Sequence, residues 1–322
     1  MINKGITIII CTFNGEERLE STIAHIAKQV VPDYINWEVT LADNGSKDNT
    51  IKRAITEWEK HDLRSVKFNI IKETKPGKLY ALQNAIKHAN FEYLIICDDD
   101  NWLANDYVAK AYNLLEERKD IAAVGGKGIP VTCGNFPDWF KDYHFEYAVG
   151  PQSEQTGIIK SRGILWGAGL ATRRSLYLKM YKQYQSFLPE CALNILSAED
   201  TEYCMRLQLK GYKLYYDSSL IFYHFIPPFK LTEEFRDGKL LKGFKDSQEI
   251  LGKYHAAMRA YIKTKSRWDL KIGLLLIAPI NYIFSSSKKR AEKAKNTLYH
   301  LLPFEIATDS VSQRIKDFVK SE

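Results

Sequence analysis

The first 120 residues alternate between short apolar runs and segments with helical spacing, and this alternation restricts the fold more than any other feature of the sequence. The run "GITIIICTF" predicts a buried strand, and residues 16–30 after it place apolar side chains on one helical face. The pattern repeats with the strands "WEVTLAD", "VKFNIIK" and "EYLIICD", followed by the helices "NTIKRAITEWEKH", "GKLYALQNAIKHA" and 105–118. Strict alternation predicts βαβ units with right-handed crossovers around a parallel sheet.

Beyond residue 120 the pattern is less regular. Residues 125–166 are irregular and aromatic, and "WGAGLATRRSLY" then predicts a strand and the start of a helix. "SAEDTEYCMRLQLKGY" predicts a helix, and "KLYYDSSLIFYHF" predicts a strand pair or one bent strand. After Pro228 the chain becomes helical, basic and amphipathic. The predicted units are therefore 1–228, with halves 1–120 and 121–228, and a helical C-terminal extension 229–322.

Acidic side chains gather where two predicted strands end. Asp43 ends the second strand, and Asp98, Asp99 and Asp100 end the fourth. In open α/β sheets, ligands bind beyond the carboxyl ends of the strands. Adjacent carboxylates repel one another, and Mg²⁺ or Mn²⁺ shared with a phosphate would relieve that repulsion. The alternative is a solvated turn at the start of the next helix. The sequence also leaves open whether Asp98 acts with Asp100 or Asp99 acts with Asp100.

Three further residues each allow two interpretations. Asp43 lies in "LADNGSKDNT", which forms either an Asn-Gly turn or an acceptor for a nucleobase N–H or a ribose. Asp200 completes a capping box with Ser197, or it is a general base at a helix N-terminus facing the same cleft. His224 is either a packed residue on an aromatic strand or a third metal ligand beside the acids.

Glycine-rich phosphate loops of the usual kinds are missing from the sequence. No G-x-x-x-x-G-K-[ST] occurs, and no G-x-G-x-x-G follows the first strand. A bound nucleotide would then be held through a metal ion, which argues against P-loop NTPases and NAD-dependent dehydrogenases.

Six segments, in this order, resemble the family 2 glycosyltransferases of the GT-A fold. They are "IIICTFNGEERLESTI", "LADNGSKDNT", "KPGKLYALQNAIKHA", "LIICDDDNWL", "WGAGLATRR" and "SAEDTEYCMRLQLKGYKLYYDSSLIFYH", within about residues 5–226. The resemblance implies an α/β fold with a Rossmann-like mixed sheet and flanking helices. Residues 1–120 would be its nucleotide-binding half and 121–228 its acceptor-side half.

The resemblance also implies an activity. A sugar would pass with inversion from a nucleoside-diphosphate donor, usually a UDP-sugar, to a saccharide or lipid-linked acceptor, as in bacterial surface polysaccharide synthesis. Mn²⁺ or Mg²⁺ would stabilise the leaving diphosphate.

Each site residue takes its implied role from a matching position. Asp200 would be the catalytic base, and Asp100 and His224 would bind the metal ion. Lys78 would lie near the base or the phosphates, or would be an exposed lysine at a helix start. Trp166 and Gly167 would bring the backbone close to the sugar, although Trp166 equally suits a core. Four residues would surround the nucleobase: Thr12, Phe13, Asn14 and Glu16, with Phe13 at a position where tyrosine is common. Asp43 would hold the uracil. Asp98 and Asp99 would complete the donor contacts, with Asp99 on the ribose.

The acceptor side and the tail are less defined. Phe136, Trp139 and Phe140 would stack on acceptor sugars or would pack their own loop. The apolar run 272–284 has 13 residues, against about 20 for a spanning helix, and basic residues flank it. It would lie on an anionic membrane, or dock on the catalytic domain or a second subunit.

Charge and cysteine content bound the remaining possibilities. The net charge of +7 occurs without a recognised nucleic-acid motif, so no nucleic-acid partner is expected. The chain has five cysteines, an odd number, without metal-site spacing, and its first residues do not have the form of a signal peptide. These features predict a cytoplasmic protein. If the tail binds a membrane, it would lie on the inner face.

Two other functions compete with transfer of a sugar. A nucleotidyltransferase would carry a glycine-rich basic loop where this chain has "TFNGEE", and the intact acids and His224 argue against a degenerate membrane-associated scaffold.

Overall fold

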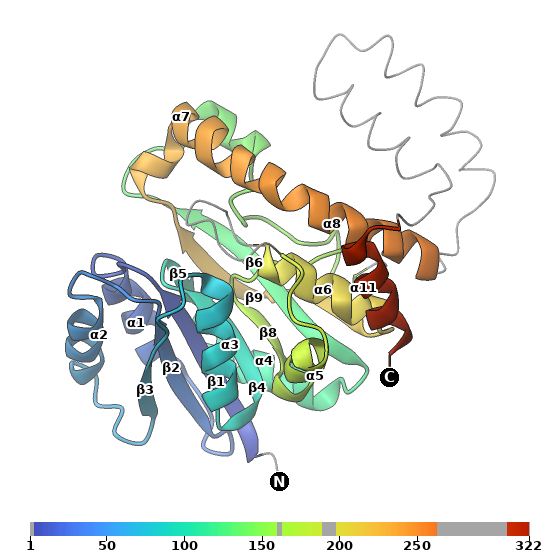
Figure 1. The fold of residues 1–322 in the computed structure, drawn as a ribbon. Coiled ribbons are helices and arrows are strands. Elements are labelled where there is room, and N and C mark those ends of the chain that lie inside the picture. Colours follow the sequence, from blue (N-terminus) through green and yellow to red (C-terminus); the bar gives the residue numbers. More distant parts are fainter. Residues whose placement is uncertain (1–2, 160–162, 189–197, 263–307, 322) are drawn as a thin grey trace.

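The computed structural model describes residues 3–159, 163–188, 198–262 and 308–321 (Figure 1). One mixed β-sheet runs through the molecule in the strand order β3-β2-β1-β4-β8-β6-β9-β5, and β7 pairs with β9. Helices cover both faces of this sheet (Figure 1). The architecture confirms the predicted α/β class with a Rossmann-like mixed sheet and flanking helices.

The N-terminal half is the predicted parallel βαβ arrangement. Its four strands are β1 (Asn3–Thr12), β2 (Trp37–Asp43), β3 (Lys67–Lys72) and β4 (Phe91–Asp98), all paired in parallel. The connecting helices are α1 (Leu19–Ala27), α2 (Thr50–Glu59), α3 (Lys78–His88) and, after β4, α4 (Tyr107–Glu117). Because β1, β2 and β4 run in the same direction, their carboxyl ends meet at one edge of the sheet.

The second half reverses direction. The strand β8 (Leu170–Arg173) pairs antiparallel with β4 and with β6 (Ile121–Val131), so the sequence prediction of irregular structure from residue 125 is wrong up to Val131. The segment predicted as a strand pair or one bent strand is the single strand β9 (Lys213–Phe225). The remaining elements are β5 (Asn101–Leu103), the short 3-10 helix η1 (Asp138–Asp142), β7 (Gly157–Ile158), α5 (Arg174–Lys182) and α6 (Glu199–Leu209).

A glycine allows β6 and β9 to change register. Their pairing shifts between Gly125 and Lys127, and a Cβ on Gly126 would lie 2.1 Å from the carbonyl oxygen of Leu220. Any larger residue would push the strands apart at this irregularity. The kinked pair continues to His224, which β9 places opposite Asn101 of β5.

Alternating side chains of the strands feed two separate cores. Ile8, Ile10 and Cys97 face the side covered by α1, α2 and α4, whereas Ile9 and Ile96 face the side covered by α3, α5 and α6. Both strands at the centre of the sheet are buried on the two faces, which explains their nearly continuous apolar sequence. The sheet edge is thus rigidly supported where the acids emerge.

The C-terminal extension packs on the second of these faces. It contains η2 (Pro228–Leu231), α7 (Glu233–Phe235), η3 (Arg236–Leu240), α8 (Leu241–Tyr261) and α11 (Ser310–Lys320). Tyr254 and Met258 of α8, and Phe318 of α11, join the core around α6. Among the described residues, none of the helices is both long and apolar enough to cross a bilayer. The apolar run 272–284 lies outside the described residues, and the domain boundary near Pro228 stays a prediction.

Candidate active site

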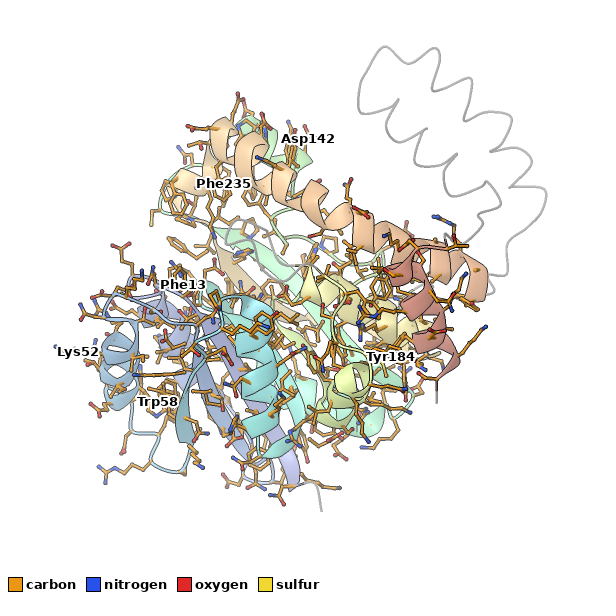
Figure 2. All side chains as sticks on the ribbon, in the orientation of Figure 1. Phe13, Lys52, Trp58, Asp142, Tyr184 and Phe235 are labelled. Atoms are coloured by element: carbon orange, nitrogen blue, oxygen red, sulfur yellow. The ribbon has the colours of Figure 1, made fainter. Side chains whose placement is uncertain are left out.

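A cavity of about 360 Å³ opens at the carboxyl ends of β1 and β4. Seven of the predicted site residues line it, namely Thr12, Phe13, Lys78, Asp98, Asp99, Asp100 and His224. The same wall includes Arg18, Asn44 and Lys230, which the sequence analysis did not single out. Figure 2 shows Phe13 at this edge, on the side of the C-terminal segment that carries Phe235. The Phe13 side chain is 48% exposed and offers a ring face to a planar ligand.

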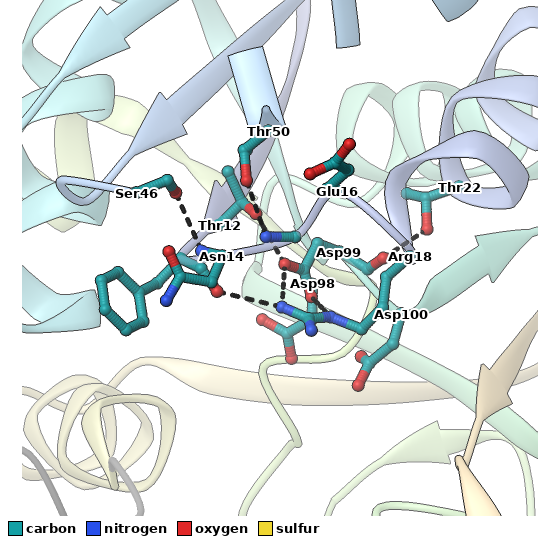
Figure 3. Close-up of polar contacts among 12 residues, drawn as sticks. Thr12, Asn14, Glu16, Arg18, Thr22, Ser46, Thr50, Asp98, Asp99 and Asp100 are labelled. Atoms are coloured by element: carbon teal, nitrogen blue, oxygen red, sulfur yellow. Dashed lines mark hydrogen bonds and ion pairs between the residues drawn. The ribbon is translucent and has the colours of Figure 1, made fainter. Parts of the chain in front are cut away.

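Both carboxylate oxygens of Asp99 accept hydrogen bonds from other side chains of the protein (Figure 3). Its Oδ2 accepts from the Thr12 hydroxyl at 2.6 Å and from Arg18 Nη2 at 2.8 Å, and its Oδ1 accepts from Arg18 Nε at 2.9 Å. The Arg18 guanidinium also reaches the carbonyl of Phe13 at 3.1 Å. The bidentate pair between Arg18 and Asp99 fixes the loop after β1. The Asp99 carboxylate thus already accepts three hydrogen bonds within the protein, and its assignment to ribose stays a prediction.

The polar residues predicted around the base hold two loops together. The backbone N–H of Asn14 donates to Ser46 Oγ at 2.8 Å (Figure 3), and the Asn14 side-chain oxygen accepts from the Lys47 N–H at 2.9 Å. Glu16 accepts from the backbone and side-chain nitrogens of Asn49 at 3.0 and 3.1 Å. Neither Asn14 nor Glu16 lines the cavity, and their contacts fix the loop that follows the exposed Phe13.

Asp43 lies at the end of β2 and is 3% exposed. Its Oδ1 accepts from the Ser46 N–H at 3.3 Å, as in the Asn-Gly turn that the sequence also allowed. It is outside the cavity lining, whereas the adjacent Asn44 is part of it. The role of Asp43 toward uracil stays a prediction.

Lys78 connects the two groups of acids. Its Nζ lies 2.6 Å from Asp98 and 3.0 Å from Glu199. Burial disfavours the ammonium, but the charges of Asp98 and Glu199 outweigh that cost and raise the pKa of Lys78 well above its usual value. Lys78 is therefore a charged bridge between the end of β4 and the start of α6, and not an exposed lysine at a helix start.

Asp200 follows Glu199 in the first turn of α6. Its Oδ2 accepts from the Gly167 N–H at 2.7 Å and its Oδ1 from the Thr201 N–H at 2.6 Å. Burial, and then the charge of Glu199, raise its pKa to about 6. The helix is preceded by Ala198 as N-cap, and Ser197 of the expected capping box lies outside the described residues. A carboxyl with this pKa can accept a proton near neutral pH and release it again.

Asp100 faces one imidazole and one ammonium. His224 Nε2 lies 3.6 Å and Lys230 Nζ 3.2 Å from its oxygens. Burial favours the neutral acid, but His224 and Lys230 outweigh it and hold the pKa of Asp100 well below its usual range. His224 Nδ1 lies 2.8 Å from the Tyr147 carbonyl, which can only accept, so Nδ1 carries a proton and Nε2 is the ring nitrogen that faces Asp100.

These contacts show what kind of ion the site would accept. Within the described part of the chain, no group of three or more His, Cys, Asp or Glu side chains is arranged to hold a metal ion. Asp100 and His224 supply one carboxylate oxygen and one imidazole nitrogen, a partial set that suits Mn²⁺ or Mg²⁺ when substrate oxygens complete it. The ammonium of Lys230 already shows that this corner favours a cation. The donor set therefore fits a metal ion shared with a diphosphate.

Sequence reasoning overlooked Arg18, Glu199 and Lys230. Arg18 and Glu199 stand inside quoted motifs, "GEERLE" and "SAED", and the need of a buried acid cluster for counter-charges could have pointed to Arg18. Lys230 follows the expected domain boundary and only the folded chain brings it to Asp100. No local sequence signal marks it.

Comparison with known proteins agrees with this geometry. The sequence profile described as "Glycosyl transferase family 2" matches residues 7–179. The chain belongs to this family. As a family 2 member it is a glycosyltransferase enzyme. This confirms the glycosyltransferase prediction over the nucleotidyltransferase and scaffold alternatives.

Curated relatives share part of the family 2 chain. An uncharacterized glycosyltransferase, YfnE, of Bacillus subtilis is 29% identical over 157 residues, which are 49% of this chain and 36% of that protein. The poly-beta-1,6-N-acetyl-D-glucosamine synthase of Staphylococcus aureus is 24% identical over 225 residues, 70% of this chain and 50% of the synthase. The chain thus spans half or less of the length of these relatives.

Solved structures show the same fold at low identity. S. aureus TarS 1–349 in complex with UDP-GlcNAc aligns with a TM-score of 0.52 and 16% identity, covering 97% of this chain and 92% of that one. The mannosyltransferase PcManGT of Pyrobaculum calidifontis, in complex with GDP-Man and Mn²⁺, aligns with a TM-score of 0.54 and 18% identity, covering 98% and 88%. They support the GT-A fold of this family 2 protein.

Proposed function

We propose that the protein is a metal-dependent inverting glycosyltransferase that moves a sugar from a UDP-sugar to a saccharide or lipid-linked acceptor. One observation carries the proposal: the Asp98–Lys78–Glu199 bridge joins the acid cluster that ends β4 to the turn that holds Asp200. This bridge supports a shared site for Asp100 as the proposed cation ligand and Asp200 as the proposed general base. The titles of the solved neighbours, with UDP-GlcNAc in one and GDP-Man with Mn²⁺ in the other, make a nucleotide sugar and a divalent cation the first ligands to test.

The donor side divides into a base end and a phosphate end. Phe13 offers its exposed ring to the base, and Asp98, whose side chain is 28% exposed, is better placed than the saturated Asp99 to accept from ribose hydroxyls. At the phosphate end, Asp100 and His224 would hold Mn²⁺ or Mg²⁺, which acts as a Lewis acid on the diphosphate when bound. Lys230 lies beside them and adds a protein cation where negative charge grows as the glycosidic bond breaks.

The acceptor side needs only one carboxylate. Asp200 takes the proton of the attacking hydroxyl, and the two backbone N–H groups on its oxygens keep the carboxylate oriented. A single displacement from the face opposite the leaving group inverts the anomeric centre. No nucleophilic second carboxylate is required, in contrast to retaining hydrolases.

The decisive experiment measures binding and turnover together. Thermal-shift screening against UDP- and GDP-sugars with Mn²⁺ selects the donor, and NMR of the transfer product reports its anomeric configuration. We expect Asp200→Asn to lower turnover at least a thousandfold while isothermal titration shows nucleotide affinity within threefold. Asp106→Asn, an exposed acid at the start of α4, serves as control. A fully active Asp200→Asn enzyme, a retained configuration, or undiminished turnover in EDTA would each contradict part of the proposal.

A further inference from the structure

An exposed aromatic side chain packs on the segment that holds Asp200, the proposed general base. Phe145 is 55% exposed, and its ring packs on Trp166 with the centroids 5.6 Å apart and the planes inclined by 60°. Trp166 beneath it is only 6% exposed. Trp166 therefore serves as a buried support, and the outer face of Phe145 is available to a ligand.

Trp166 is linked to Asp200, the proposed general base, through the backbone of the Trp166–Gly167 segment. Gln152 Oε1 accepts from the Trp166 N–H at 2.7 Å, and the next N–H, of Gly167, donates to Asp200 at 2.7 Å. A Cβ on Gly167 would lie 3.4 Å from the Asp200 side chain. The aromatic pair and the carboxylate thus share one short, tightly packed backbone segment.

The loop that carries Phe145 is held on its other side by the cation-binding corner. The Tyr147 carbonyl accepts from His224 Nδ1 at 2.8 Å, and the Tyr147 hydroxyl donates to the Lys230 carbonyl at 2.5 Å. Gly128 and Gly150 exchange two backbone hydrogen bonds, at 3.2 and 2.7 Å. The exposed ring is therefore not on a loose loop, since contacts to both ends of the site determine its position.

The aromatic residues that the sequence allowed either as acceptor contacts or as loop packing lie against other side chains. Phe136 and Phe140 stack on each other with centroids 4.5 Å apart, and Phe140 is 3% exposed. The Arg236 guanidinium covers Trp139 at 4.7 Å. These side chains form an aromatic cluster with Tyr147 that supports the loop, which matches the alternative that they pack their own loop.

We propose that Phe145, supported by Trp166, is the platform on which the acceptor saccharide stacks. The inference rests on the proposed function and names the part of that site which binds the acceptor. A pyranose has one face rich in C–H groups that packs on an aromatic ring, and its hydroxyls remain free at the ring edge. The Trp166–Gly167 segment both supports this ring and donates to Asp200, so the proposal requires a hydroxyl of the stacked sugar to reach that carboxylate. The platform selects a carbohydrate acceptor over a simple alcohol or water.

The test separates acceptor binding from donor chemistry. Hydrolysis of the selected donor by water reports the donor site, and transfer to N-acetylglucosamine oligosaccharides reports the acceptor site. Phe145→Ala is expected to raise the acceptor KM at least tenfold and to leave the hydrolysis rate and the donor KM within twofold. Phe145→Trp keeps a ring and is expected to stay within threefold of the wild-type acceptor KM. Tyr34→Ala, which removes a 64% exposed ring elsewhere, is the control.

The outcomes distinguish the platform from the activity itself. An unchanged acceptor KM in Phe145→Ala, with normal hydrolysis in the wild type, overturns the platform alone. Equal losses of hydrolysis and transfer in Phe145→Ala also overturn it, because the residue then supports the fold or the donor site. A wild-type protein with neither hydrolysis nor transfer for any nucleotide sugar overturns the proposed function and this inference with it.

Discussion

Glu199 and Asp200 are adjacent carboxylic acids whose surroundings separate their roles. Glu199 lies 3.0 Å from the Lys78 ammonium, whereas Asp200 accepts hydrogen bonds from backbone N–H groups. Burial is the main cause of the raised pKa of Asp200, and the charge of Glu199 is the second. In the proposed mechanism, Glu199 is therefore a positioning residue that raises the pH at which Asp200 loses its proton and can act as a base.

The pH dependence follows from the sign of this coupling. The proposed mechanism needs Asp200 as a carboxylate, so kcat/KM of the wild type should reach its full value above the pKa of about 6 and decline below it. In Glu199→Gln the neighbouring negative charge is gone, which lowers the pKa of Asp200 and should move the acid limb of the profile to lower pH. Asp106→Asn should leave the limb in place. An unmoved or upward-moved limb in Glu199→Gln would show that Glu199 does not act on the base.

Individual site residues differ in how far the sequence could reveal them. Asp100, Asp98 and Lys78 were found because strand ends and motif order bring them to one edge, and the cavity contains them. Asn14 and Glu16 also stand in a motif, but their side chains bond to the loop after β2. A motif records that a residue type is needed at a position, and only the folded chain shows whether it faces a ligand or a neighbouring loop.

At the scale of elements, one buried cation holds α6 in place. The Arg206 side chain is fully buried and donates to the carbonyls of Met180, Tyr184 and Gln185 at 2.7, 2.6 and 2.6 Å. It also reaches Glu202 at 3.2 Å and the Tyr254 hydroxyl at 2.8 Å. That network joins the end of α5, the helix α6 that carries Asp200, and the extension helix α8.

Tyr254→Phe removes one hydroxyl from this network. The hydroxyl accepts from Arg206 and donates to Glu202 at 2.7 Å, so its loss leaves two buried charged groups each short of one partner. The expected decrease in the free energy of unfolding is about 1–3 kcal/mol. Urea denaturation followed by circular dichroism measures it. Tyr261→Phe, at the more exposed end of α8, should change little, and equal stability of the two variants would mean that α8 is not held through Tyr254.

Elements with a clear period could be predicted, and those defined by distant partners could not. The four strands from β1 to β4 and their helices appear near the predicted residues because buried strands and amphipathic helices mark themselves locally. β6 was not among the predicted strands, and its residues from Gly125 on were predicted to be irregular because the glycines and Pro130 lack strand character. They form a strand because β9 lies beside them, with pairs as far as Val131 and Phe225.

At the scale of the whole molecule, the extension is part of the enzyme's support. Tyr254 and Met258 of α8 and Phe318 of α11 are buried in the same hydrophobic core as α6. The segment between these two helices includes the apolar run 272–284 and the basic cluster "KKRAEKAK". Because α8 and α11 are anchored on the catalytic body, anything that binds the intervening segment also tethers the active site.

We propose that this intervening segment holds the enzyme on an anionic membrane, and charge reversal tests it. Each Lys or Arg close to such a surface contributes about 1 kcal/mol of attraction, so changing Lys288, Lys289 and Arg290 to Glu should weaken binding to phosphatidylserine-containing liposomes by roughly a hundredfold or more. Flotation of the full chain measures the partition, and 0.5 M salt should release the wild type because the attraction is screened. Reversal of three lysines on the catalytic body, Lys47, Lys52 and Lys67, is the matched control. If the tail variant floats as well as the wild type, or the control loses binding equally, the segment is not the anchor, and its docking on the enzyme or on a second subunit becomes the better explanation.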